Sequence, residues 1–186
     1  MQMKRKMITK NYETAIFANG CFWCTEAIFQ KLKGVKEVTP GFIGGTLENP
    51  SYKEVCTGAT GHAEALRIVY DSHEISYRQL LEVFFTTHDP TTLNRQGNDV
   101  GTQYRSEIFY TNLDQKEQVE RFIAILNDQN FFGQPVVTQL SQASDFYPAE
   151  EEHFDYFNRN PENKYCAAVI APKVAKFQNF FKEYLR

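Results

Sequence analysis

The sequence of 186 residues has no apolar run of the roughly 18 residues that a membrane-spanning helix needs. The basic residues near its start, in MQMKRKMITKNYETAIF, are not followed by the apolar core of a signal peptide. Neither sign of charge dominates, because 20 lysines and arginines stand against 23 acidic residues and the net charge is -3. We therefore expect a soluble, cytoplasmic protein with no membrane or nucleic-acid partner.

Cysteine is also scarce, since four residues are too few for a disulfide scaffold in a chain of this length. Two of them, Cys56 and Cys166, are single and far apart, so the ligand spacing of a zinc site is missing and no metal is expected. The length calls for one domain over residues 1–186. An N-terminal extension is expected at residues 1–12 and a separate C-terminal segment at residues 158–186.

Apolar periodicity predicts an α+β protein. Strands are expected at residues 14–18, 36–45, 63–71, 104–110 and 135–140. Helices are expected around residue 21, at residues 76–88, after Asn112 through residue 126, at residues 150–157 and from Pro172 to the C-terminus. This β-α-β-β-α-β order with extensions predicts a two-layer sandwich with a mixed sheet, related to ferredoxin-like folds.

Two polar segments do not fit this scheme. Residues 88–103 form a long loop between a helix and a strand, and such loops are usually functional or disordered. Residues 158–173 place Cys166 between two proline-marked breaks, and we expect this segment to be mobile.

The stretch GCFWC, residues 20–24, places two cysteines around Phe22 and Trp23, the only tryptophan. A thiol in the first turn of a helix faces unpaired N–H groups and the positive end of the helix dipole, which favour its thiolate form. Cys21 is therefore a candidate nucleophile, and a buried structural cysteine is the alternative. The two aromatic rings could line an apolar pocket or belong to the core, and a disulfide with Cys24 stays open.

Polar, glycine-rich stretches carry further candidates. Glu64 stands at the entry to an apolar strand, where burial would raise its pKa and let it act as a general acid; a solvated strand end is the alternative. His62 is expected to make a structural hydrogen bond. Asp99 and Tyr104 lie in QGNDVGTQYRSEIFY, whose glycines allow close backbone approach but whose ending does not fit a phosphate loop.

Four blocks in order, from about Phe17 to Ile170, resemble the A-type peptide methionine sulfoxide reductases. They are GCFW, GGTLENPSYKEVCTGATGHAEALRIVYD, HDPTTLNRQGNDVGTQYRS and HFDYFNRNP. The resemblance implies an α+β fold and an enzyme that reduces methionine S-sulfoxide, free or in proteins, to methionine. It further implies a cysteine sulfenic acid, then an intramolecular disulfide that thioredoxin reduces, with dithiothreitol as a substitute and no bound cofactor.

The resemblance also implies roles for individual residues. Cys21 matches the nucleophile and Glu64 the proton donor to the sulfoxide oxygen. Tyr52 and Tyr104 match tyrosines that hydrogen-bond this oxygen. Asp99 matches an aspartate that orients polar groups. Phe22 and Trp23 match an apolar slot for the substrate methyl group. His153 and Tyr156 match a further element near the site.

The resolving cysteine is where this sequence departs from the family pattern. Many members have glycine where this chain has Cys24. Cys166 matches a C-terminal resolving cysteine of several members, so we expect Cys166 to resolve the sulfenic acid, with Cys24 as the alternative. Cys56 is expected to pack in a turn near the site.

Two other functions are alternatives. A general thiol–disulfide oxidoreductase would use Cys21 and Cys24, but no thioredoxin-like βαβ pattern surrounds them and the tyrosines and Glu64 would have no task. A binding module for oxidised methionine without catalysis is disfavoured by the intact nucleophile and acid.

Overall fold

The computed structural model describes residues 11–186, so the expected extension at residues 1–12 lies almost wholly outside it. Its main strands are β1 (Tyr12–Asn19), β2 (Val35–Ile43), β3 (Ala63–Asp71), β6 (Ser106–Tyr110), β7 (Gln139–Gln142) and β8 (Tyr147–Pro148). They form one sheet in the order β7-β6-β1-β3-β2-β8. Strands β6 and β7 pair in parallel and the other neighbours antiparallel, which confirms the predicted mixed sheet.

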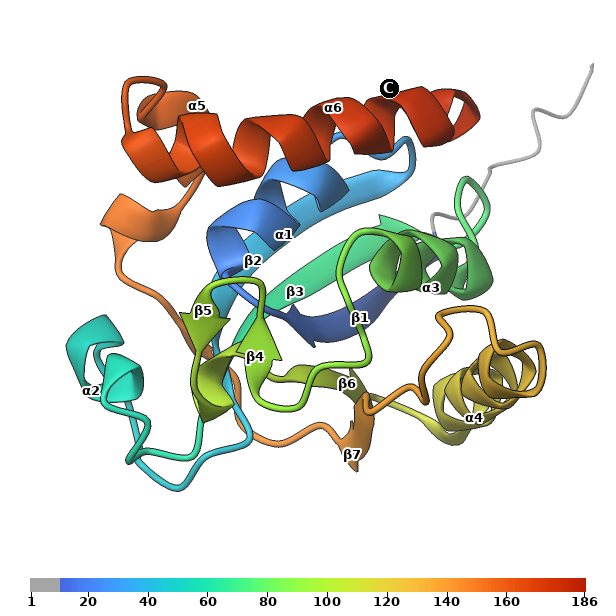
Figure 1. Cartoon of the computed structure of the whole chain (residues 1–186), viewed down its shortest axis with the longest axis horizontal. Coiled ribbons are helices and arrows are strands. Elements are labelled where there is room, and N and C mark those ends of the chain that lie inside the picture. Colours follow the sequence, from blue (N-terminus) through green and yellow to red (C-terminus); the bar gives the residue numbers. More distant parts are fainter. Residues whose placement is uncertain (1–10) are drawn as a thin grey trace, which may run out of the picture.

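Helices pack against one face of the sheet (Figure 1). The longer ones are α1 (Phe22–Phe29), α3 (Tyr77–Thr86), α4 (Leu113–Asp128) and α6 (Ala171–Phe180). Helix α3 starts where the sequence predicts, because Ser76 caps it and exchanges hydrogen bonds with Gln79. Among residues 11–186, none of the helices has the length and apolar content needed to cross a bilayer.

Strand β1 illustrates how the sheet divides apolar side chains between its two faces. Ala15 and Phe17 belong to the helix-facing core, whereas Ile16 and Ala18 belong to the smaller cluster on the opposite face. The ring of Phe17 packs against Phe84 of α3 with the centroids 5.0 Å apart. Apolar side chains therefore lie on both faces of the sheet, and the helices pack on the face that carries Ala15 and Phe17.

Four short elements carry the polar loops. They are α2 (Tyr52–Cys56), β4 (Arg95–Gln96), β5 (Asp99–Val100) and α5 (Tyr156–Arg159). The predicted long loop at residues 88–103 thus contains a small hairpin of its own, in which β4 and β5 pair antiparallel. This hairpin and α2 lie at the same end of the molecule (Figure 1).

The segment around Cys166 differs from the expectation of a mobile loop. Residues Cys166–Ile170 form a widened helical turn that runs directly into α6, and Cys166 is completely buried. Pro172 does not interrupt the helix, because it lies in the first turn of α6, where a missing N–H group costs no hydrogen bond. The C-terminal segment is therefore helical and packs on the core around α1.

Candidate active site

Cys21 lies at the start of α1, as the sequence predicts. Strand β1 ends at Asn19, and Gly20 makes the turn with a φ of 100°, a value that favours glycine. A Cβ atom at Gly20 would also lie 2.7 Å from the side chain of Gln96. The carbonyl of Cys21 then accepts hydrogen bonds from the N–H groups of Cys24 and Thr25, which closes the first turn.

The Cys21 thiol is less acidic than its position at the helix start predicts. Its side chain is only 9% exposed, and burial raises its pKa well above the usual value. A hydrogen bond with Cys24 and the negative charge of Glu64 raise the pKa further, and the N–H group of Trp23 lowers it too little to compensate. Burial therefore outweighs the helix N-terminus here.

Cys24 behaves in the opposite way. Its pKa is lowered to about 7, first by the hydrogen bond from the Cys21 thiol, against the effect of burial. The charge of Lys173 and the hydroxyl of Tyr165 lower it further. The Cys21 thiol therefore stays protonated, and Cys24 is the more acidic of the pair.

Glu64 provides a neutral acid beside this pair. It lies near the start of β3 with only 1% of its surface exposed, and its Oε2 accepts a hydrogen bond of 3.0 Å from the N–H group of Phe22. Burial raises its pKa to about 8, although that hydrogen bond acts in the other direction. The Glu64 carboxyl is therefore largely protonated at neutral pH, in the form that can donate a proton.

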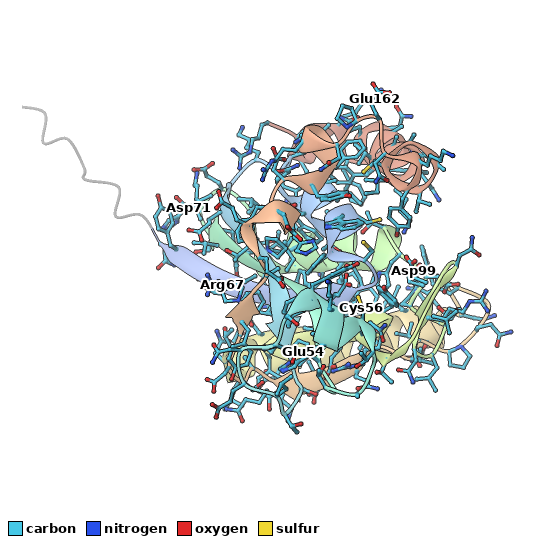
Figure 2. All side chains as sticks on the ribbon, turned by 90° about the vertical axis from the view of Figure 1, so that its left-hand side faces the viewer. Glu54, Cys56, Arg67, Asp71, Asp99 and Glu162 are labelled. Atoms are coloured by element: carbon cyan, nitrogen blue, oxygen red, sulfur yellow. The ribbon has the colours of Figure 1, made fainter. Side chains whose placement is uncertain are left out.

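Two phenols and a carboxylate surround Glu64. Burial, followed by the charge of Glu64, raises the pKa of Tyr52 and of Tyr104, so both hydroxyls remain hydrogen-bond donors. Tyr52 opens α2, and Tyr104 ends a short 3₁₀ turn after β5. Asp99, labelled in Figure 2, accepts a hydrogen bond of 2.7 Å from the hydroxyl of Tyr165.

Aromatic rings form a stack next to the thiols. Trp23 lies parallel to Tyr156, with centroids 3.7 Å apart and 6° between the planes. Its indole N–H donates to Nδ1 of the buried His153 over 3.2 Å, and His153 lies 4.4 Å from the Tyr52 ring. These rings line a cavity of about 600 Å³, so Trp23, Tyr52, His153 and Tyr156 meet as the sequence predicts, and Phe22 packs beneath them.

The structure assigns the two other cysteines different surroundings. Cys166 is buried near Cys24, whose charge contributes to raising the pKa of the Cys166 thiol after burial itself. Cys56, labelled in Figure 2, is exposed at the end of α2, where its sulfur accepts a hydrogen bond from the Tyr52 hydroxyl. Among residues 11–186, no group of His, Cys, Asp and Glu side chains is arranged to hold a metal ion.

Three residues at the site were not predicted from the sequence to belong to it. Tyr165 bridges Asp99 and Cys24, and its position next to Cys166 in the sequence is the only signal for it. Arg105 pairs with Glu107 over 2.6 Å and donates to the carbonyls of Thr102 and Gly61, so it ties the loops of Tyr104 and Glu64 together. The third, Glu26, is a buried carboxyl on α1, one helical turn after Phe22.

Fold and site together define a thiol-dependent oxidoreductase in which a protonated carboxyl lies beside two cysteines. The model of the family described as peptide methionine sulfoxide reductase matches residues 13–185. A peptide methionine sulfoxide reductase MsrA of Deinococcus radiodurans is 54% identical over 94% of this chain and 84% of its own length. That of Pasteurella multocida is 52% identical over 92% and 97%. The chain belongs to the MsrA family and is an enzyme that reduces methionine sulfoxide.

Solved structures agree with this assignment. Methionine sulfoxide reductase A of Corynebacterium diphtheriae superimposes with a TM-score of 0.73 at 34% identity, covering 84% of this chain and 78% of its own. Reduced Mxr1 of Saccharomyces cerevisiae gives a TM-score of 0.72 at 32% identity, covering 87% and 94%. Mxr1 has also been solved in complex with Trx2. The predicted α+β class is confirmed.

Proposed function

We propose that this enzyme reduces the S epimer of methionine sulfoxide, free or within proteins, through a sulfenic acid on Cys21. The observation that carries the proposal is Glu64, a buried acid whose carboxyl is held by the N–H group of Phe22, the residue next to Cys21. A sulfoxide sulfur becomes a good electrophile only when its oxygen is protonated or strongly hydrogen-bonded. The first turn of α1 thus holds the Glu64 carboxyl, which comes from β3, close to the nucleophile.

In the first step, Glu64 gives its proton to the sulfoxide oxygen while the Cys21 sulfur attacks the substrate sulfur. Tyr52 and Tyr104 donate hydrogen bonds to this oxygen, and Asp99 orients polar groups of the site. The attack forms a bond between the two sulfurs. The oxygen then passes to the Cys21 sulfur as the bonds from the substrate sulfur to that oxygen and to Cys21 break, so methionine leaves and Cys21 carries a sulfenic acid. The thiol proton of Cys21 replaces the proton that Glu64 has given, so the step is proton-neutral.

Protonated Glu64 also explains how the high pKa of Cys21 is compatible with attack. The carboxylate form of Glu64 is one of the groups that raise the Cys21 pKa. When the carboxyl is neutral, this contribution is absent, and the Cys21 thiol passes its proton to Glu64 only as Glu64 protonates the sulfoxide oxygen. The substrate methyl group is proposed to lie against Phe22 and Trp23.

For the resolving step, the geometry supports a sequence of two exchanges. Cys24 is hydrogen-bonded to Cys21 and has the lower pKa, so we infer that it condenses first with the sulfenic acid and releases water. Cys166, near Cys24, then attacks the Cys24 sulfur, which frees Cys21 and leaves a disulfide between Cys24 and Cys166. In this proposal Cys24, the alternative in the sequence analysis, condenses with the sulfenic acid, and Cys166, the residue expected to do so, enters in the second exchange.

The order of the thiols can be tested by mapping disulfides after a single turnover. In wild type we expect a Cys24–Cys166 disulfide. In Cys166→Ser we expect the disulfide between Cys21 and Cys24, and Cys56→Ser, as the control, should give the wild-type result. A Cys21–Cys166 disulfide in wild type that persists in Cys24→Ser would contradict the relay and make Cys166 the direct resolver.

Thioredoxin is the proposed reductant of the final disulfide. The complex of Mxr1 with Trx2 supports this choice, because a related enzyme pairs with a thioredoxin there. Dithiothreitol should replace thioredoxin in the test tube, since exchange needs only an accessible thiolate. We propose the cytoplasm as the compartment, because its thiol pools keep cysteines reduced.

The function is tested by supplying each epimer of a methionine sulfoxide substrate with dithiothreitol. We expect reduction of the S epimer and none of the R epimer. A general thiol–disulfide oxidoreductase would instead reduce a disulfide substrate and neither sulfoxide. A binding module would retain the S epimer without producing methionine.

A further inference from the structure

Glu26 is a buried carboxyl that the proposed chemistry does not use. It lies on α1, one turn beyond Phe22, with 3% of its surface exposed. Its Oε1 accepts a hydrogen bond of 2.9 Å from the N–H group of Asp155, and its carboxylate also accepts from the N–H group of Tyr156. Burial raises the pKa of Glu26 to about 7, against these two hydrogen bonds, which favour the charged form.

The partner of Glu26 is a strained turn. Asp155 has a φ of 50°, in the left-handed region, which is unusual for a residue other than glycine. Asp155 stands at the N-cap of α5, but its side chain makes no capping hydrogen bond and instead accepts from Asn158. Such a turn persists where its surroundings hold it, and Glu26 supplies the acceptor that the start of α5 needs.

This turn leads directly to Trp23. Tyr156, whose N–H group Glu26 accepts, is the residue whose ring lies 3.7 Å from Trp23. His153, two residues before the turn, accepts the indole N–H of Trp23. Trp23 and Glu26 themselves belong to the same helix. Glu26 therefore anchors, from α1, the segment that contacts Trp23 on its ring face and at its nitrogen.

We propose that Glu26 is a positioning residue for the substrate slot, which holds the backbone of Asp155 and Tyr156 so that Tyr156 and His153 fix the orientation of Trp23. Glu26 touches neither the reacting atoms nor the nucleophile. Its loss should therefore weaken the fit of the substrate side chain more than it slows the chemical step. The kinetic part of this inference rests on the proposed reduction of methionine sulfoxide, whereas the orientation of Trp23 does not.

The test uses the fact that Trp23 is the only tryptophan of the chain. Its emission spectrum reports its surroundings without any substrate. We expect Glu26→Ala to change this emission and to raise the half-saturating concentration of N-acetylmethionine S-sulfoxide N-methylamide about tenfold in single turnovers, with a smaller loss in the maximal rate. Glu26→Gln keeps one acceptor oxygen and should fall between Glu26→Ala and wild type in both measurements.

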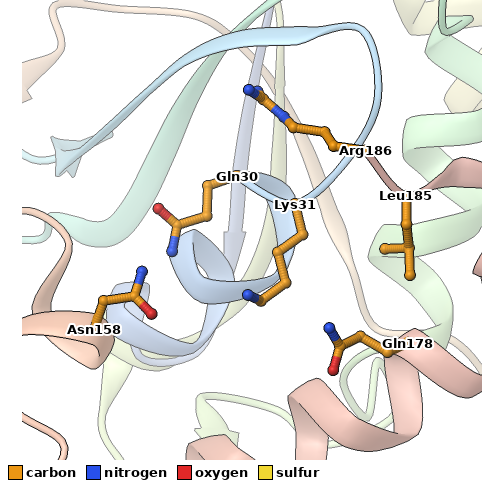
Figure 3. A pocket seen from close by; sticks show the side chains of 6 residues that line it. All are labelled: Gln30, Lys31, Asn158, Gln178, Leu185 and Arg186. Atoms are coloured by element: carbon orange, nitrogen blue, oxygen red, sulfur yellow. The ribbon is translucent and has the colours of Figure 1, made fainter.

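Gln30 provides a matched control. It is the C-cap residue of α1, one turn after Glu26, and lines a polar pocket together with Asn158 of α5 (Figure 3). The N–H group of Asp155 donates to Glu26 and not to Gln30. Gln30→Ala should therefore leave both the emission and the half-saturating concentration at their wild-type values. Equal changes in Gln30→Ala and Glu26→Ala would reduce the effect to general loosening of α1 and overturn the proposal.

Two further results distinguish the role of Glu26 from a folding defect and from a failure of the proposed function. If Glu26→Ala does not fold, Glu26→Gln decides, and wild-type emission and half-saturation in that variant would contradict the role of Glu26. If the wild-type enzyme does not reduce the sulfoxide, the proposed function fails. The comparison of emission spectra still tests whether Glu26 positions Trp23.

Discussion

Replacing Cys21 by serine is expected to abolish methionine sulfoxide reduction, with thioredoxin or with dithiothreitol. A serine oxygen cannot take up the substrate oxygen as a sulfenic acid, and we propose that Cys24, although it is a thiol on the same helix, acts only in the later exchange. Removing a covalent nucleophile costs on the order of 10⁶ in rate in other enzymes. Methionine release from the S-sulfoxide, followed by chromatography over hours, is the measurement.

Cysteine variants at the other positions separate loss of the nucleophile from loss of recycling. With thioredoxin as the reductant, Cys24→Ser should release one equivalent of methionine per enzyme, because its nucleophile is intact, and then stop, because the first exchange is lost. Cys56→Ser should turn over repeatedly, since its exposed thiol has no assigned step. Sustained turnover by Cys21→Ser would show that another residue is the nucleophile.

Replacing Glu64 by glutamine should slow the first turnover by a factor on the order of 10² to 10⁴, the range that a general acid contributes. The glutamine can still accept the hydrogen bond from Phe22, so the start of α1 should keep its position. The proton for the sulfoxide oxygen is lost. Stopped-flow or quenched single turnovers measure this rate, and Glu74→Gln, which removes a surface carboxyl paired with Lys36, should have no effect.

The pH dependence of the same rate identifies Glu64 as the acid. Its pKa is about 8, and the protonated form is the active one, so the wild-type rate should fall as the pH rises through about 8. In Glu64→Gln this decline should disappear, because the amide does not titrate there. A decline of the same shape in the variant would assign the titration to another group and contradict the role of Glu64.

The central strands of the sheet were predictable from the sequence because they alternate between two apolar faces. The edge strands were not: β7, expected at residues 135–140, spans Gln139–Gln142, and β8 was not predicted. β3 begins and ends at the predicted residues, and α3 follows from its capping box. Helix α2 has the same kind of signal, since Ser51 and Glu54 form a capping box. It went unpredicted because a helix of five residues is too short to show apolar periodicity.

The site was only partly predictable, because its electrostatics depends on burial by distant segments. The sequence correctly places Cys21 at a helix start, but the rise in its pKa comes from a core that α6 and the turn at Cys166 help to enclose. Tyr165 and Asp99 are 66 residues apart, and no local pattern joins them. Proline near Cys166 suggested a mobile loop, yet Pro172 stands where a helix tolerates it.

The central claim is that Cys21 receives the oxygen of methionine S-sulfoxide. A variant with Cys24→Ser and Cys166→Ser retains this thiol and lacks both proposed resolving thiols. Incubated with one equivalent of the S-sulfoxide and no reductant, it should release one equivalent of methionine and carry a dimedone-reactive sulfenic acid on Cys21, located by peptide mass spectrometry. Methionine release without modification of Cys21, or no release at all, would contradict the account.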